Sequence, residues 1–182
     1  NSAGTGGSGS APGPRRATVG IARGAAAPLA VPDAGAAAST IWGRTRALVE
    51  GPFTPAAVLD LPEASLRGAG LSGAKTAAIL DLAACVDRGD IDLALVGRLA
   101  DDEVEAMLVQ ARGIGPWTAH MFLIFDLHRL DVWPTGDLGV RAGFAKAWRL
   151  DSAPTPKELA ELGEQYRPYR SVVAWYCWRA AG

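Results

Sequence analysis

The sequence has few of the residues from which most metal and disulfide sites are built. Its 182 residues include two cysteines, Cys85 and Cys177, and two histidines, His120 and His128. Two cysteines cannot form a disulfide framework, a four-thiolate zinc site or a four-cysteine iron–sulfur cluster. Because the histidines are few and isolated, we expect no protein-bound metal site.

Long apolar runs and an excess of positive charge are also absent. The apolar stretches are far shorter than the roughly 20 residues of a membrane span, and no apolar core segment follows a basic start at the N-terminus. We therefore expect a soluble, cytoplasmic protein without a targeting signal or membrane contact. The formal net charge is −1, so no global basic field attracts polyanions. Any binding of nucleic acid must come from a local site.

The composition divides the chain in two. Of the first 36 residues, 22 are Gly, Ala or Pro and none is aromatic, which predicts a low-complexity tail over residues 1–36 that is disordered or poorly specified. Residues 37–182 show helical periodicity with almost no strand alternation, so we predict one all-α domain of about nine or ten short helices. The predicted helices span residues 40–50, 54–61, 62–67, 72–88, 92–99, 103–111, 116–127, 138–149, 155 onward and 168–180.

A glycine hairpin over residues 112–116 joins two of these helices. Gly113 and Gly115 permit positive φ and leave amide N–H groups uncovered, and Pro116 suits the first position of the next helix, whose N-terminal N–H groups point the same way. Backbone dipoles of this kind can hold a phosphate without a basic side chain. The plainer interpretation, a glycine turn between two helices, stays open at this stage.

A carboxylate follows 22 residues after Gly115. Asp137 comes directly after the Pro134-Thr135-Gly136 turn and has apolar neighbours. A lone aspartate at this place is most often a helix N-cap. An acid among apolar residues is also a candidate reactive group, and the two roles are compatible.

Taken together, the motifs from about Ala37 to Trp178 resemble the helix–hairpin–helix base-excision DNA glycosylases, and among them the 3-methyladenine DNA glycosylase II branch. The matching segments are Gly70–Lys75, the hairpin Gly113–Ala119, Asp131–Pro134 leading to Asp137, Arg167–Ser171 and Ala174–Trp178. The resemblance implies a two-lobed helical fold around a cleft. It also implies a monofunctional glycosylase that hydrolyses the N-glycosidic bond of alkylated purines in base excision repair.

The resemblance places the family's catalytic aspartate at Asp137. It places Trp117 where bifunctional members carry a nucleophilic lysine, so we expect base release without strand cleavage. We further expect a base pocket formed by Trp117, Trp178, Met121 and Trp133. Ordinary core packing is the alternative for these side chains, since the chain has six tryptophans.

DNA-backbone contacts are expected from two kinds of group, backbone amides of the hairpin and basic side chains at helix ends. The candidates are Gly113, Ile114, Gly115, Thr118, Lys75 and Arg170. The implied partner is double-stranded DNA with a flipped damaged base, bound by a monomer associated with the nucleoid. No cofactor is expected, although members of the family can hold a monovalent cation at the hairpin. Leu48 and Leu71 are candidates for the residue that wedges the strands apart.

The N-terminal segment departs from the family. Members normally carry a helix with a glutamine-rich turn before the equivalent of Ala37, whereas Arg15 to Ala36 contains no glutamine and is interrupted by Pro28 and Pro32. The N-terminal lobe is therefore expected to be incomplete. This leaves two alternatives open: a non-catalytic helix–hairpin–helix DNA-binding module or remnant, and a glycosylase for oxidised or mismatched bases.

Overall fold

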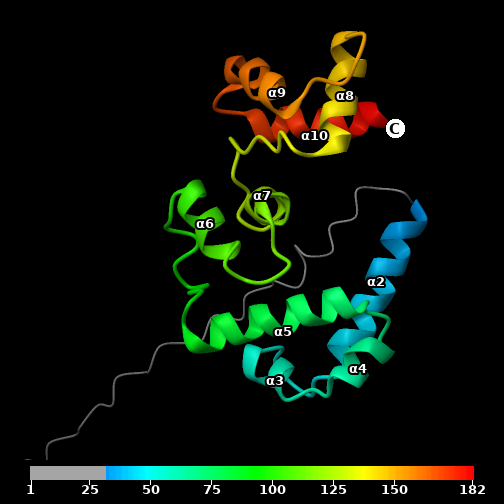
Figure 1. Cartoon of the computed structure of the whole chain (residues 1–182), viewed down its shortest axis with the longest axis vertical. Helices are drawn as coiled ribbons and strands as arrows, with labels where there is room; N and C mark the ends of the chain where they lie inside the picture. The colour runs from blue at the N-terminus through cyan, green and yellow to red at the C-terminus, as the bar shows by residue number, and fades with distance from the viewer. Residues whose placement is uncertain (1–31) are drawn as a thin grey trace, which may run out of the picture.

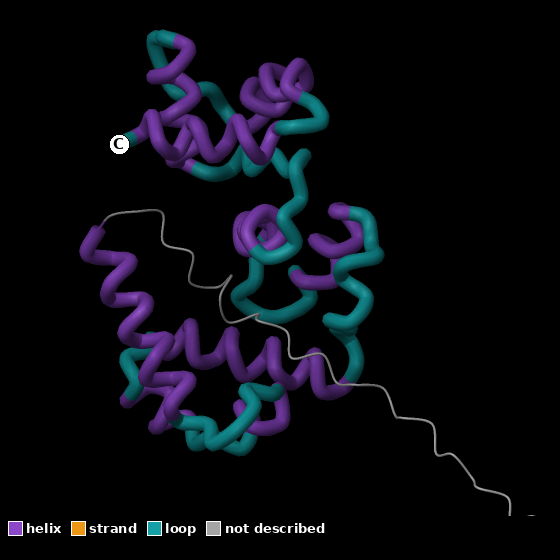
Figure 2. Tube along the Cα trace, turned by 180° about the vertical axis from the view of Figure 1, so that it is seen from behind, coloured by secondary structure: helices purple, strands orange, loops and turns teal. Residues whose placement is uncertain are grey.

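The computed structural model describes residues 32–182, with side chains from residue 37, and this range consists of helices and loops without a strand (Figure 2). The all-α prediction is therefore confirmed. The α-helices are α2 (Pro32–Ala47), α3 (Pro55–Leu59), α4 (Glu63–Gly68), α5 (Gly73–Arg88), α6 (Asp101–Leu108), α7 (Pro116–Phe125), α8 (Leu138–Trp148), α9 (Pro156–Gly163) and α10 (Arg170–Ala181), with a 3-10 helix η1 (Glu164–Tyr166). No helix within this range is both long and apolar enough to cross a membrane.

Local capping rules account for several helix starts. The Thr54 hydroxyl accepts from the Ala57 amide with Pro55 at the first helical position, and the Ser72 hydroxyl accepts from the Lys75 amide. Thr155 forms a capping box with Glu158 at the start of α9. Each interaction satisfies an amide that the helix itself leaves unpaired. These predicted starts are confirmed.

Two predictions about the helices are wrong. Helix α2 begins at Pro32, eight residues before the predicted start, because proline is well suited to the first turn of a helix. It thus includes the last five residues of the predicted tail, whereas residues 1–31 lie outside the described residues. The predicted helix over residues 92–99 is a series of turns, in which the Leu95 amide donates to Asp92 and the Arg98 amide to Leu95.

The helices form three groups along the long axis of the molecule. Helices α2 to α5 lie at one end, α8 to α10 at the other, and α6 and α7 lie between them (Figure 1). One buried core combines the C-terminal part of α5 with α6, α7 and Val132. A second core lies within the α8–α10 group and contains Trp133, Val140, Phe144, Leu159, Ala174 and Cys177. The fold therefore has two apolar centres, and the loop of residues 126–137 runs from one to the other.

Helices α8 and α10 cross at very close range. A Cβ atom added to Gly143 would collide with the backbone carbonyl of Cys177. Only a glycine allows the two backbones to approach this closely. The crossing fixes the position of Asp137, which precedes α8, relative to Trp178, which lies on α10.

Candidate active site

The Asp137 side chain is the centre of the candidate site. The residue caps helix α8, and its Oδ1 accepts from the Val140 amide at 2.7 Å. The Asp137 amide donates to the Pro134 carbonyl at 2.9 Å, so the Pro-Thr-Gly turn sets the direction of the side chain. Only 3% of the residue is exposed. The helix cap and the candidate reactive carboxylate are therefore the same group.

Two tryptophans from distant parts of the chain meet this carboxylate. The Trp178 indole Nε1 donates to Asp137 Oδ1 at 2.9 Å, and the Trp117 Nε1 donates to Oδ2 at 2.6 Å. With the Val140 amide, three neutral N–H groups replace water around one buried carboxylate, and none of these donors is a cationic side chain. Hydrogen bonds to an ionised acceptor are stronger than neutral ones. The arrangement fixes the orientation of both carboxylate oxygens.

Gly139 makes the contact with Trp178 possible. A Cβ atom at this position would lie 2.9 Å from Trp178 Cδ1 and 3.2 Å from Asp137 Oδ1. Both separations are closer than a side-chain carbon normally tolerates, so a larger residue would displace the indole or the carboxylate. Gly139 therefore leaves the space that the Trp178 indole and the Asp137 carboxylate need.

Phe125 belongs to the same aromatic group, although the sequence did not single it out. Its ring stacks on Trp178, with centroids 5.7 Å apart and planes inclined by 27°. Trp117, Phe125 and Leu138 are 44%, 39% and 75% exposed, respectively. Large apolar side chains are thus exposed beside the buried carboxylate, where a planar ligand could stack. The signal in the sequence was the spacing of Trp117, Met121 and Phe125 at intervals of four residues along α7.

Two predicted pocket residues lie in the interior instead. Trp133 packs against Phe144 in the second core, and its Nε1 donates to the Leu159 carbonyl at 2.7 Å. A Cβ atom on Gly163 would overlap its ring. Met121 is only 1% exposed. Neither side chain lines an open surface. Residues next to a site in the sequence can also point into the interior and pack in the core, as these two do.

The predicted hairpin lies against helix α5. Gly113 adopts φ +80°, and a Cβ atom there would lie 2.8 Å from the Cβ of Ala78. The Ile114 amide donates to Ala111 and the Ala119 amide to Gly115, while the Ile114 side chain packs against the first core. The amides of Gly113, Gly115, Trp117 and Thr118 have no acceptor within residues 32–182. These N–H groups are adjacent, and they leave a place where an anion can bind.

The predicted basic contacts differ in their availability. The Lys75 side chain is exposed at the first turn of α5. Arg170, by contrast, is 12% exposed at its side chain and bonds to both carboxylate oxygens and the carbonyl of Asp131 and to Glu164. These Arg170 donors are engaged at the α10 end of the protein, and the contact of Arg170 with a DNA phosphate stays a prediction.

The pairing with Arg170 also changes the pKa of Asp131. Burial raises the pKa of Asp131, but the hydrogen bonds and charge of Arg170, assisted by Arg167, outweigh this effect and hold the pKa below its usual range. Arg167 donates to Asp131 Oδ2 at 2.8 Å and to Glu164. This network ties the start of α10 to the loop that leads to Asp137.

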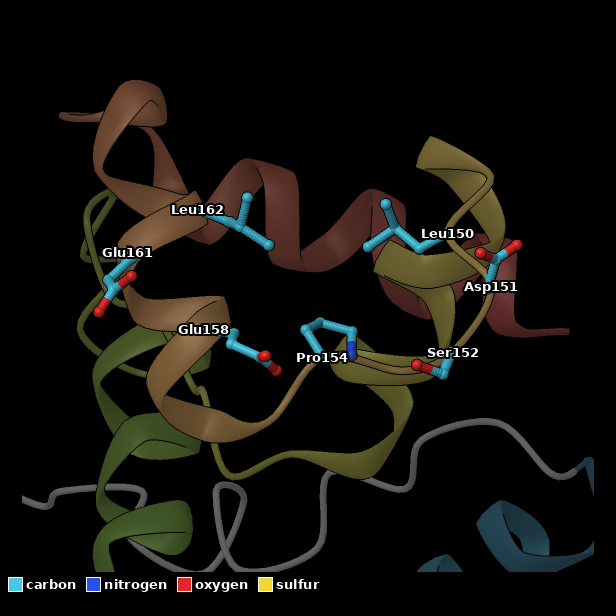
Figure 3. A pocket seen from close by; sticks show the side chains of 7 residues that line it. All are labelled: Leu150, Asp151, Ser152, Pro154, Glu158, Glu161 and Leu162. Carbon is cyan, nitrogen blue, oxygen red and sulfur yellow. The ribbon is translucent and has the colours of Figure 1, made fainter.

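The described part of the chain contains no group of three or more His, Cys, Asp or Glu side chains that could hold a metal ion. An open hollow of about 540 Å³ lies between the end of α8 and helix α9 (Figure 3). It is lined by Leu150, Asp151, Ser152, Pro154, Glu158, Glu161 and Leu162. Its three acids repel phosphate, and it includes none of the site residues above.

Comparisons with known proteins identify the family of the chain. The model of the HhH-GPD superfamily base excision DNA repair proteins matches residues 34–168. DNA-3-methyladenine glycosylase 1 of Schizosaccharomyces pombe is 34% identical over 148 residues, covering 80% of this chain and 65% of the relative. The DNA-3-methyladenine glycosylase of Saccharomyces cerevisiae is 31% identical, covering 81% of this chain and 62% of that protein. The chain thus spans somewhat less than two thirds of these curated relatives.

Solved structures extend the comparison to three dimensions. The structure of S. pombe 3-methyladenine DNA glycosylase (Mag1) in complex with abasic DNA superposes with a TM-score of 0.76 at 32% identity, covering 87% of this chain and 77% of that one. A DNA-3-methyladenine glycosidase from Bacillus halodurans superposes with a TM-score of 0.74, also at 32% identity, over 89% of this chain and 73% of that one. On sequence and fold alike, the chain belongs to the HhH-GPD superfamily of base excision DNA repair proteins.

Proposed function

We propose that this protein is a monofunctional DNA glycosylase of the 3-methyladenine DNA glycosylase II branch, which hydrolyses the N-glycosidic bond of alkylated purines in duplex DNA. The observation that carries the proposal is the buried Asp137 carboxylate, held by the indole N–H groups of Trp117 and Trp178 next to the glycine hairpin. The names of the relatives, several of them 3-methyladenine glycosylases, support the substrate class.

Asp137 has the chemistry that this reaction needs. Breaking an N-glycosidic bond develops positive charge on the deoxyribose, and a fixed carboxylate beside the sugar stabilises that charge. The same carboxylate can orient or deprotonate the attacking water. A methylated purine already carries a positive charge and leaves readily, so the reaction needs no separate general acid.

The exposed aromatic surface suits a cationic base. A purine must leave the duplex before it can be attacked, and a positively charged ring stacks favourably on the faces of Trp and Phe. Trp117 and Phe125 offer such faces beside Asp137. Because Asp137 is 3% exposed and Trp117 covers its Oδ2, a deoxyribose reaches the carboxylate only when the Trp117 side chain rotates away.

Trp117 also determines the fate of the DNA strand after base release. An indole cannot form a Schiff base with the sugar, so no covalent intermediate leads to strand scission at this position. The product is an abasic site in an intact strand. Incubation of alkylated duplex with the protein should therefore leave the backbone whole until alkali is added, and direct nicking would contradict this part of the proposal.

The hairpin amides are proposed to bind the phosphate backbone of DNA. The unpaired N–H groups are those of Gly113, Gly115, Trp117 and Thr118. The exposed ammonium of Lys75 is a further candidate for a phosphate contact. Each phosphate contact makes binding weaker as salt increases. Carbonyl oxygens are the type of ligand that hard cations prefer, so the backbone carbonyls of the hairpin would hold a monovalent cation, which would supply positive charge next to the DNA backbone. No chemical step depends on that ion.

One experiment tests the proposal directly. Release of free base from methylated duplex DNA is compared for the wild type, Asp137→Asn and the control Asp102→Asn, an exposed acid at the start of α6. We expect base release by the wild type and the control and loss of release by Asp137→Asn, with DNA binding nearly intact and folding checked by circular dichroism. Turnover unchanged in Asp137→Asn would remove this residue from the mechanism.

The same assay separates the alternatives. DNA binding by the wild type without release of any base would indicate a non-catalytic helix–hairpin–helix module. Release of oxidised or mismatched bases alone would retain the enzyme and overturn the substrate class.

A further inference from the structure

Helix α5 provides a platform for the hairpin. The Asp81 Oδ2 accepts from the backbone amide of Arg112 at 2.6 Å, across 31 residues of sequence. One helical turn earlier on α5, Ala78 lies against Gly113, so close that a Cβ atom on the glycine would approach its Cβ to 2.8 Å. Ala78 and Asp81 are three residues apart and therefore share one face of the helix. The hairpin thus meets α5 at one apolar contact and one hydrogen bond.

The backbone of the hairpin needs such support. Gly113 adopts φ +80°, and glycine populates positive and negative φ about equally. The Arg112 N–H that Asp81 binds belongs to the peptide unit between Ala111 and Arg112. Without this partner that unit can rotate, and the direction of the next amide, that of Gly113, changes with it. Fixing a flexible backbone before a ligand arrives removes part of the entropic cost of binding.

We propose that Asp81 is a positioning residue for DNA binding: its carboxylate fixes the Arg112 peptide so that the following hairpin amides point outward at a phosphate. This inference rests on the proposed function, because the ligand is a DNA phosphate. Asp81 itself does not touch the DNA. The short, charge-assisted bond to a backbone N–H is of the stronger kind.

The negative charge of Asp81 and its hydrogen bond have opposite effects on DNA binding, so the two can be distinguished. A carboxylate near a phosphate site repels DNA, so its negative charge by itself weakens binding. Its role as a hydrogen-bond acceptor strengthens binding. Asp81→Asn removes the charge and keeps an acceptor, so it should strengthen DNA binding. Asp81→Ala removes both, so it should weaken DNA binding.

The experiment compares Asp81→Asn and Asp81→Ala with the wild type and with Asp87→Asn. Asp87 is an exposed acid further along the same helix, and its side chain makes no hydrogen bond or ion pair within residues 37–182, so it serves as a charge-matched control. Fluorescence anisotropy measures the Kd for a duplex that contains an abasic-site analogue at several salt concentrations. Base release from methylated duplex gives kcat and KM.

We expect Asp81→Ala to raise the Kd and KM roughly 5- to 10-fold, the effect of losing one hydrogen bond, with kcat unchanged. Asp81→Asn and Asp87→Asn should bind as tightly as the wild type or more tightly. If Asp81→Ala binds DNA as tightly as Asp81→Asn, the carboxylate acts only through its charge and the proposal is overturned. A fall in kcat with unchanged KM overturns it as well.

A second measurement keeps this inference separate from the proposed function. Hydrogen exchange of the Arg112 amide, followed by NMR without DNA, should become faster in Asp81→Ala than in Asp81→Asn, while amides inside α5 keep their protection. Unchanged exchange at Arg112 would overturn the positioning role. If instead exchange responds as expected but the wild type releases no base, the proposed reaction fails and the hairpin inference stands.

Discussion

Replacing Gly139 with alanine should separate the stability of the protein from its activity. The new Cβ atom would lie 2.9 Å from Trp178 Cδ1 and 3.2 Å from Asp137 Oδ1. The indole must therefore move by a few tenths of an ångström, at the expense of its 2.9 Å hydrogen bond to Asp137. A hydrogen bond to a charged group contributes about 1.5–3 kcal/mol, so base release should slow by roughly 10- to 100-fold.

The loss of this hydrogen bond also lowers the free energy of unfolding, but part of that loss should be offset. Alanine is favoured over glycine in a helix by up to about 1 kcal/mol, and this gain offsets part of the steric cost. Gly43→Ala is the matched control, because this glycine lies within α2 and a Cβ atom there meets no atom within 4 Å. The control should raise the melting temperature by about 2–4 °C without changing activity. The assay is single-turnover release of methylated base, with melting followed by circular dichroism. Wild-type turnover in Gly139→Ala would refute the steric reasoning.

Two other groups give further predictions. Burial raises the pKa of the Cys177 thiol to about 12 from an ordinary value of 9.0. The thiol of the unfolded chain loses its proton at a lower pH than the buried thiol. The free energy of unfolding should therefore fall by about 1.4 kcal/mol per pH unit above pH 9. Urea denaturation from pH 8 to 10.5 should show this slope in the wild type but not in Cys177→Ala. Arg170→Lys keeps the charge but loses the paired hydrogen bonds to Asp131. The free energy of unfolding should therefore fall by about 1–3 kcal/mol, while the salt dependence of DNA binding stays unchanged. A decrease of that salt slope by about one would instead show that Arg170 contacts a phosphate.

Local rules predicted the parts of the fold that depend on neighbouring residues. The caps at Thr54, Ser72 and Thr155 follow from a hydroxyl placed before a helical segment, and the structure forms all three. The turn before Asp137 is equally local. Proline is ambiguous in this respect, since it breaks a helix interior but suits a first turn, and Pro32 occupies the first turn of α2.

Side-chain burial depends on distant packing and was harder to predict. The sequence predicts Trp133 in the base pocket, but Leu159 and Gly163 accommodate it in the interior. The engagement of Arg170 depends on Asp131, 39 residues away. Phe125 and Asp81 were missed for the same reason: their importance comes from Trp178 and Arg112, which are close only in the folded chain.

The bond between Trp117 and Asp137 joins the two apolar centres of the molecule. Trp117 lies in the first turn of α7, whose Ala119, Phe122 and Leu123 pack in the first core. Asp137 caps α8, whose Val140 and Phe144 belong to the second core. The Phe125–Trp178 stack is a second contact between the same two groups of helices, so relative motion of the two groups must disturb both contacts. The difference in emission between the wild type and Trp117→Phe isolates this indole from the other five tryptophans, and it should report, in the absence of DNA, how often the two groups of helices separate.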